Sequence, residues 1–139
     1  MVDAIGATGG DRQDEGDPLR GQVLGGRYRL DLRLGEGGMG AMYRGHDLVL
    51  DRPVAIKLLG PELVDDEVLA QRFDREAQAL SMLDHPNCVQ VFDAGTTTRG
   101  GKYIVMQLLD GHELRRLLGA PLPPPRAVGL ALQLLRGLD

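Results

Sequence analysis

Residues 34–45, LGEGGMGAMYRG, place five glycines among twelve positions, between two segments that alternate in the manner of β-strands. Gly35, Gly37 and Gly40 form a GxGxxG pattern, which three phosphate-binding architectures and many plain turns share. A Walker A loop requires Lys and then Ser or Thr after the last glycine, whereas this sequence continues with Ala and Met. The pattern alone therefore leaves a dinucleotide fold, a phosphate-covering hairpin and an ordinary flexible turn open.

The segments on both sides of the glycines favour a hairpin. Apolar and charged residues alternate over 28–34, with the period of a half-buried strand, and 41–47 and 52–59 predict two further strands. Gly45 and Pro53 interrupt the long helix that a dinucleotide fold needs after its last glycine. We therefore expect the loop to join antiparallel strands, where the missing Cβ atoms let backbone N–H groups approach an anion.

The rest of the chain predicts an α+β fold, with a five-stranded antiparallel sheet and one main helix in the order β-β-β-α-β-β. Residues 1–26 mix Gly, Asp and Arg with few apolar residues, which is typical of a disordered leader. Apolar periodicity and helix-breaking residues then predict a helix over 61–83, with one apolar stripe made of Leu69, Phe73, Leu80 and Leu83. Two strands are predicted over 88–95 and 102–109. A short helix over 112–119, an extended connector over 120–125 and a last helix follow them.

Two charged residues at otherwise apolar positions argue against a plain turn. Lys57 shares a strand face with Ala55 and Leu59, and Glu76 interrupts the apolar stripe of the helix. Because an unpaired carboxylate is costly to bury, its cheapest partner is a cation across the sheet. The sequence thus predicts a buried Lys57–Glu76 ion pair, and removing one member of such a pair typically costs about 3 to 5 kcal/mol.

Composition bounds the class of protein. The 139 residues, 42% hydrophobic and 26% charged, suit one domain, and residues 1–20 carry −3 of the net charge of −4. No basic run or aromatic platform suggests nucleic acid, and no apolar stretch is long enough for a membrane segment. The single cysteine, Cys88, is expected to be a small buried hydrophobe. We expect a cytoplasmic protein without a metal site of its own.

Residues 27–139 resemble the bacterial Ser/Thr protein kinases that are similar to eukaryotic ones, without a large insertion. The resemblance rests on five motifs in order: LGEGGMGAMYRG, VAIK at 54–57, RFDREAQAL at 72–80, LDHPN at 83–87 and YIVMQLLDG at 103–111. It implies a kinase N-lobe over 27–108, and a hinge with the start of a truncated C-lobe over 109–139.

The resemblance also implies an ATP site. The glycine backbone would cover the phosphates, and Lys57, held by Glu76, would contact the α- and β-phosphates. Adenine would lie between apolar side chains, Met106 would limit access to the back of the pocket, and the Gln107 carbonyl and Leu109 amide would bind the adenine edge. Met42 and Gln107 stand where the family usually has Val and Glu. The complete set of expected nucleotide contacts is Leu34, Gly35, Glu36, Gly37, Gly38, Met39, Gly40, Met42, Ala55, Lys57, Met106, Gln107, Leu109 and Glu113, the last as a ribose contact.

The family's catalytic parts are missing from these 139 residues. An HRD aspartate accepts the substrate's proton, and an Asn and the DFG Asp hold Mg²⁺, but neither motif occurs here. We expect an ATP-binding portion that is inactive as this chain, with Mg²⁺ and a protein substrate belonging to the full-length family. Residues 127–135, AVGLALQLL, are apolar at almost every position and predict a helix that associates if left uncovered. The alternatives are a short non-catalytic nucleotide-binding or kinase-partner module, and a small β-rich domain that binds no nucleotide.

Overall fold

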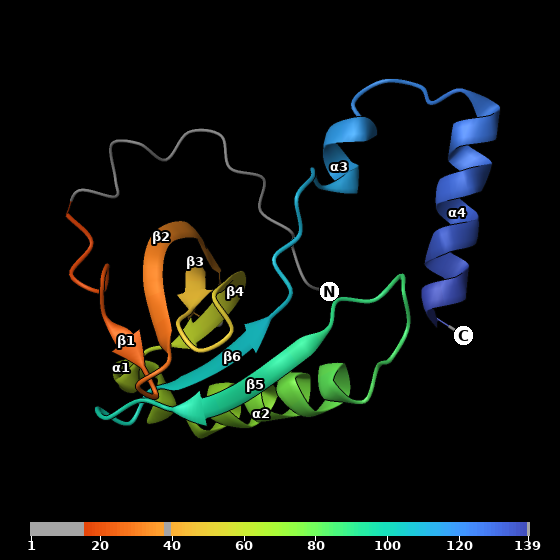
Figure 1. The fold of residues 1–139 in the computed structure, drawn as a ribbon. Helices are drawn as coiled ribbons and strands as arrows, with labels where there is room; N and C mark the ends of the chain where they lie inside the picture. Colours follow the sequence, from red (N-terminus) through yellow and green to blue (C-terminus); the bar gives the residue numbers. More distant parts are fainter. Residues whose placement is uncertain (1–15, 38–39, 139) are drawn as a thin grey trace.

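The computed structural model describes residues 16–37 and 40–138, which form a curled antiparallel sheet, one long helix against it, and two helices beyond a hinge (Figure 1). The sheet has six strands in the order β1-β2-β3-β4-β6-β5. The elements are β1 Val23–Leu24, β2 Tyr28–Gly37, β3 Gly40–Asp47, β4 Arg52–Leu59, α1 Pro61–Val64, α2 Glu67–Ser81, β5 Val91–Thr96, β6 Lys102–Met106, α3 Leu114–Leu117 and α4 Pro124–Leu138. The α+β class is confirmed.

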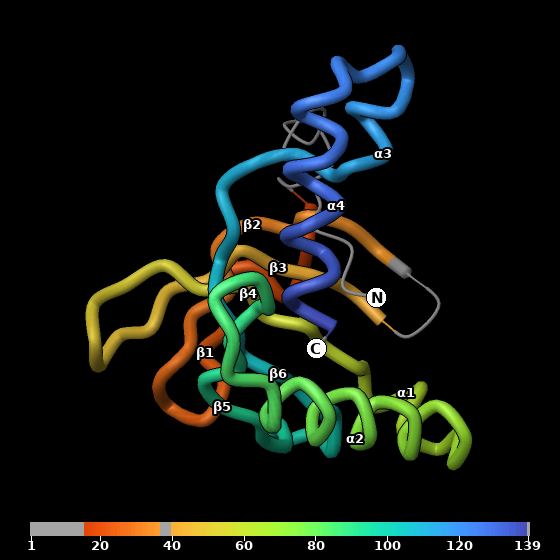
Figure 2. Tube along the Cα trace, turned by 90° about the vertical axis from the view of Figure 1, so that its right-hand side faces the viewer, coloured from red at the N-terminus to blue at the C-terminus, as the bar shows by residue number. Residues whose placement is uncertain are grey.

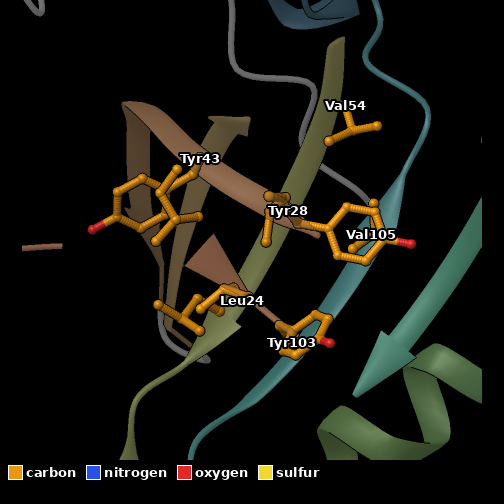
Figure 3. Packing of buried hydrophobic residues seen from close by; sticks show 9 residues of the cluster. Leu24, Tyr28, Tyr43, Val54, Tyr103 and Val105 are labelled. Atoms are coloured by element: carbon orange, nitrogen blue, oxygen red, sulfur yellow. The ribbon is translucent and has the colours of Figure 1, made fainter. Parts of the chain in front are cut away.

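Strand β4 divides the core between its two faces. Val54, Ile56 and Leu58 face a cluster inside the curl of the sheet, which Tyr28 and Tyr103 join edge to face with ring centroids 6.2 Å apart (Figure 3). The opposite face packs with α2 in a second cluster, made of Ala55, Leu59, Phe73, Ile104 and Met106. The alternation predicted for β4 is therefore confirmed. Two register shifts in β2, between Leu30 and Leu32 and between Arg33 and Gly35, bend this strand, as β-bulges do.

The helix expected over 61–83 is two helices, because α1 ends with its C-cap at Asp65 and α2 begins with Asp66 as its N-cap. The Asp66 carboxylate accepts hydrogen bonds from Val68 N at 3.0 Å and Leu69 N at 3.2 Å, which caps the free amides of α2. Of the apolar stripe, only Phe73 is fully buried, while Leu83 lies beyond the end of the helix and is 43% exposed. The sheet covers less of α2 than the periodicity predicts.

The expected leader is partly wrong, since residues 21–24 are hydrogen-bonded to β2 and Val23–Leu24 form a strand of the sheet. Strand β1 pairs Val23 with Arg29 and Leu24 with Tyr28, and Leu24 is 6% exposed in the first cluster. This short strand makes the sheet six-stranded rather than five-stranded. Sequence periodicity missed it because two residues cannot show a period. The earlier part of the leader, residues 1–15, lies outside the described residues.

Beyond the hinge, α3 and α4 stand beside one another and apart from the sheet (Figures 1 and 2). Helix α4 starts at Pro124, inside the expected connector, and none of its residues is buried. Asn87 Nδ2 donates to Gln133 O at 2.9 Å and the Cys88 thiol donates to Gly137 O at 3.2 Å, so a turn between α2 and β5 holds this helix. Cys88 is consequently half-buried rather than buried. Within the described ranges, no helix is long and apolar enough to cross a bilayer.

Candidate functional site

The predicted ion pair forms between β4 and α2. Lys57 Nζ donates to Glu76 Oε1 at 2.7 Å, and both side chains are 18% exposed. The pair is therefore only partly buried, which corrects the buried pair expected from the sequence. The pair stays partly open because Lys57 lies opposite Met42 of β3, on the sheet face where the glycine-rich hairpin begins.

The glycine-rich loop is the turn of the β2–β3 hairpin, as expected, and its end requires glycine. Gly40 has φ of +122°, and a Cβ placed there would lie 2.1 Å from the carbonyl oxygen of Leu58. The backbone therefore passes directly against β4, which no other residue type would permit without displacement. Glu36 is exposed and pairs with Arg33 at 2.9 Å. Gly38 and Met39 lie outside the described residues, as do the surroundings of Gly37.

The side chains expected around adenine gather beside this pair. Ala55 pairs with Met106 across β4 and β6, and Met42 packs against the cluster that contains both. Met106 is 1% exposed, and its role in limiting access to the pocket stays a prediction. Leu34 lies half-buried in β2, at the register shift where the loop begins. These positions form an apolar surface next to a lysine and a glycine-rich backbone.

Two backbone groups of the hinge after β6 are the expected adenine contacts, the Gln107 carbonyl and the Leu109 amide. Gln107 N donates to Gln90 O at 2.8 Å, which fixes the hinge to the segment before β5. Among residues 16–37 and 40–138, neither the Gln107 carbonyl nor the Leu109 amide has a hydrogen-bond partner. Leu108 packs toward Met106, whereas the Gln107 and Leu109 side chains line a separate cavity of about 330 Å³ between the hinge and α4. The backbone groups expected to bind adenine are thus unpaired.

Glu113 is the one expected contact that lies across the hinge, at the start of α3. Its carboxylate is 25% exposed and lies 3.4 Å from Arg115 Nη2. The structure thus brings Met42, Ala55, Lys57 and Met106 together on one sheet face and leaves Glu113 in the following segment.

Sequence reasoning missed a second lysine that reaches α2. Lys102 Nζ, at the start of β6, donates to Asp74 Oδ2 at 2.5 Å. The signal was present, because Lys57 and Lys102 are the only lysines of the chain and Asp74 lies two residues before Glu76. The same face of the sheet therefore carries two cations, each paired with a carboxylate of α2.

The described residues do not fit a magnesium site. No group of three or more His, Cys, Asp or Glu side chains among them could hold a metal ion. Mg²⁺ requires oxygen ligands in near-octahedral geometry, which the residues around Lys57 do not offer.

Comparison with known proteins identifies the family of this chain. Residues 28–139 match the protein kinase domain family, which covers most of the chain. The chain belongs to the protein kinase family. It is 37% identical over 130 residues to the serine/threonine-protein kinase pkn3 of Myxococcus xanthus, covering 92% of this chain and 24% of that protein. It is 38% identical to the serine/threonine-protein kinase PrkC of Bacillus subtilis, over 86% of this chain and 19% of PrkC.

Comparison of the fold with solved structures agrees with the sequence comparison. The crystal structure of the Mycobacterium tuberculosis PknI kinase domain superposes with a TM-score of 0.68 and 26% identity, over 86% of this chain and 49% of that one. In sequence and fold the chain is thus similar to the N-lobe region of bacterial Ser/Thr protein kinases. The chain spans 18% to 31% of the length of the curated kinases it matches, and about half of the PknI kinase domain.

Proposed function

We propose that this chain binds ATP between the β2–β3 loop, the Lys57–Glu76 pair and the hinge. The observation that carries the proposal is the Lys57–Glu76 contact of 2.7 Å, made by the residue of β4 that pairs with Met42 of the glycine-rich hairpin. Lys57 has three N–H donors, and one of them is used by Glu76. The remaining donors can bind phosphate oxygens while the carboxylate holds the amine in place.

The hinge supports the adenine end of the same proposal. An acceptor at Gln107 and a donor two residues later at Leu109 can pair with the edge of an adenine ring, while Met42, Ala55 and Met106 pack on its faces. Glu113 is the candidate for the ribose. We propose that protein Ser or Thr is phosphorylated only by the longer kinases of this family, because the residues that move the proton and hold Mg²⁺ are absent from this sequence.

Nucleotide titration of the 139-residue chain tests the proposal. We expect saturable but weak ATP binding, with a Kd on the order of 0.1 to 1 mM, because half of a kinase cleft is absent. Lys57→Ala should abolish it. Lys102→Ala is the matched control, since this variant also removes a lysine that pairs with α2 but leaves the phosphate region unchanged. Equal affinity of wild type and Lys57→Ala would contradict the site, and measurable phosphotransfer would contradict the proposed inactivity.

A second candidate function, a module that pairs with another kinase lobe, is favoured by α4. Leu132, Leu134 and Leu135 are 48% to 62% exposed, and Leu138 is 84% exposed. Such an apolar surface favours association with a protein partner. Sedimentation should show concentration-dependent association that Leu132→Lys/Leu135→Lys reduces. A chain that stays monomeric at high concentration would contradict this candidate and leave the nucleotide site unaffected.

A further inference from the structure

The segment over residues 16–24, named here the N-terminal strap, is attached to β2 along its second half. Gly21 N donates to Leu30 O at 2.7 Å, and Leu30 N donates to Gln22 O at 2.9 Å, before the β1 pairing begins. Leu24 is buried in the first core cluster and Leu19 packs against it. The strap therefore closes one side of the curled sheet (Figure 1).

The first half of the strap is attached to β3 by one side-chain hydrogen bond. The Tyr43 hydroxyl donates to Asp17 Oδ2 at 2.8 Å, while Asp17 Oδ1 accepts from Leu19 N at 2.9 Å. Figure 3 shows the Tyr43 hydroxyl pointing away from the rest of the cluster. Burial of the ring, reinforced by the Asp17 carboxylate, raises the pKa of Tyr43, so this hydroxyl remains a donor at neutral pH. A hydrogen bond to an ionised acceptor is stronger than a neutral one.

Tyr43 occupies the base of the glycine-rich loop. It pairs with Arg33 of β2, and the next pair is Met42 with Gly35, beyond a register shift. The strap thus holds β2 through Leu30 and β3 through Tyr43, immediately before the hairpin leaves its regular ladder. Movement of the loop away from the phosphates requires the two strands to bend near this point.

We propose that the strap positions the glycine-rich loop, with Asp17 acting through Tyr43 to limit how far the hairpin opens. The inference rests on the proposed ATP site and adds a positioning residue outside it. The loop covers phosphate, whereas adenosine is held by the hinge and the sheet face. Loss of the Asp17–Tyr43 bond should therefore weaken ATP binding more than adenosine binding.

Tyr43→Phe and Asp17→Ala test this positioning role, together and alone. Each should raise the Kd for ATP about three- to tenfold, the effect of one hydrogen bond, and change the Kd for adenosine less than about twofold. The double variant should bind ATP no more weakly than Asp17→Ala alone, because Tyr43→Phe then removes a bond that is already lost. Asp17→Asn keeps side-chain atoms that can bond Leu19 N and Tyr43, and its ATP affinity should stay close to that of the wild type. Asp31→Ala, which removes another carboxylate of this sheet edge, is the matched control.

If the Asp17–Tyr43 hydrogen bond only stabilises the fold, the variants will give different results. The substitutions would then lower the thermal midpoint but change ATP and adenosine affinity equally or not at all, and that result overturns the inference. Amide hydrogen exchange over 34–37 and 40–42 in the ligand-free chain provides a readout that does not need nucleotide. We expect faster exchange there in Tyr43→Phe, and unchanged exchange overturns the inference. Failure of the wild type to bind ATP contradicts the proposed function instead.

Discussion

Two ion pairs of the sheet, Arg27–Asp47 and Lys57–Glu76, differ in how completely their groups are bonded. Asp47 is 1% exposed, and its carboxylate accepts from Arg27 Nε at 2.9 Å, Arg27 Nη2 at 2.8 Å, Val49 N at 3.0 Å and Leu50 N at 3.2 Å. These four donors belong to Arg27, which directly precedes β2, and to the turn between β3 and β4, and Arg52 Nε lies 3.8 Å from Asp47 Oδ2. This pair leaves no room for a ligand.

The Lys57–Glu76 pair has a similar length, 2.7 Å, but is incompletely bonded. In the described ranges, Glu76 Oε1 is the single partner of Lys57 Nζ, and both side chains retain 18% exposure. An ion pair that has saturated its donors and acceptors can only stabilise a fold, because nothing remains for a substrate to bind. An ion pair that keeps donors in a partly open position can hold an anion. The contrast separates a pair that is bonded on several sides from one that keeps donors for the ATP phosphates, as we propose.

The largest effect is expected from Asp47→Ala. This substitution leaves Arg27 and two backbone amides without their shared acceptor, so the thermal midpoint should fall by on the order of 10 °C. Asp31→Ala, which removes the carboxylate of the exposed Arg29–Asp31 pair, should change the midpoint by far less. Differential scanning fluorimetry of both variants measures this. A midpoint shift of the same size in the two would mean that Asp47 is not a closed structural pair.

The stability of the chain at acid pH should show how strongly the Asp47 carboxylate is bonded. Hydrogen bonding to Arg27, with help from the amides of Leu50 and Val49, holds the pKa of Asp47 well below its ordinary value of 3.8 despite burial. As pH falls through about 4, the unfolded chain therefore takes up a proton that the folded chain does not, and stability is lost. Asp47→Asn lacks this proton uptake. The difference in urea midpoint between wild type and Asp47→Asn should shrink from about pH 6 to about pH 3. A constant difference would contradict the depressed pKa.

The sequence predicts the functional pair better than the structural one. Lys57 and Glu76 interrupt apolar patterns, and a charged residue on an apolar face indicates a partner of opposite charge. Asp47 ends a strand, where a carboxylate is unremarkable, and its bonds to the next turn and to Arg27 depend on a curl that no local pattern encodes. The strap was missed for the same reason, since Asp17 and Tyr43 lie 26 residues apart. Alternation within β4 predicted both faces of the core because each face depends on one strand only.

Glu76→Gln tests the functional side of the comparison. The amide keeps the shape of the carboxylate but not its charge, so Lys57 is held less firmly and the Kd for ATP should rise about three- to tenfold. Because the pair is partly exposed, the free energy of unfolding should fall by only about 1 kcal/mol, less than the cost of opening a buried pair. Isothermal titration and urea unfolding measure the two quantities. A large loss of stability with unchanged ATP affinity would make this a structural pair like Arg27–Asp47.

The smallest effect is expected from the other contact between the sheet and α2, Lys102–Asp74. Asp74 is 60% exposed, so water and salt screen the pair, and Asp74→Asn should lower the free energy of unfolding by under about 1 kcal/mol. The loss should diminish further at high salt, and ATP affinity should stay as in wild type, because Lys102 points at no phosphate position. Urea unfolding at low and high salt, with ATP titration beside it, separates this exposed tether from Lys57–Glu76. A clear loss of ATP affinity in Asp74→Asn would mean that α2 needs both lysines to keep Glu76 in reach of Lys57.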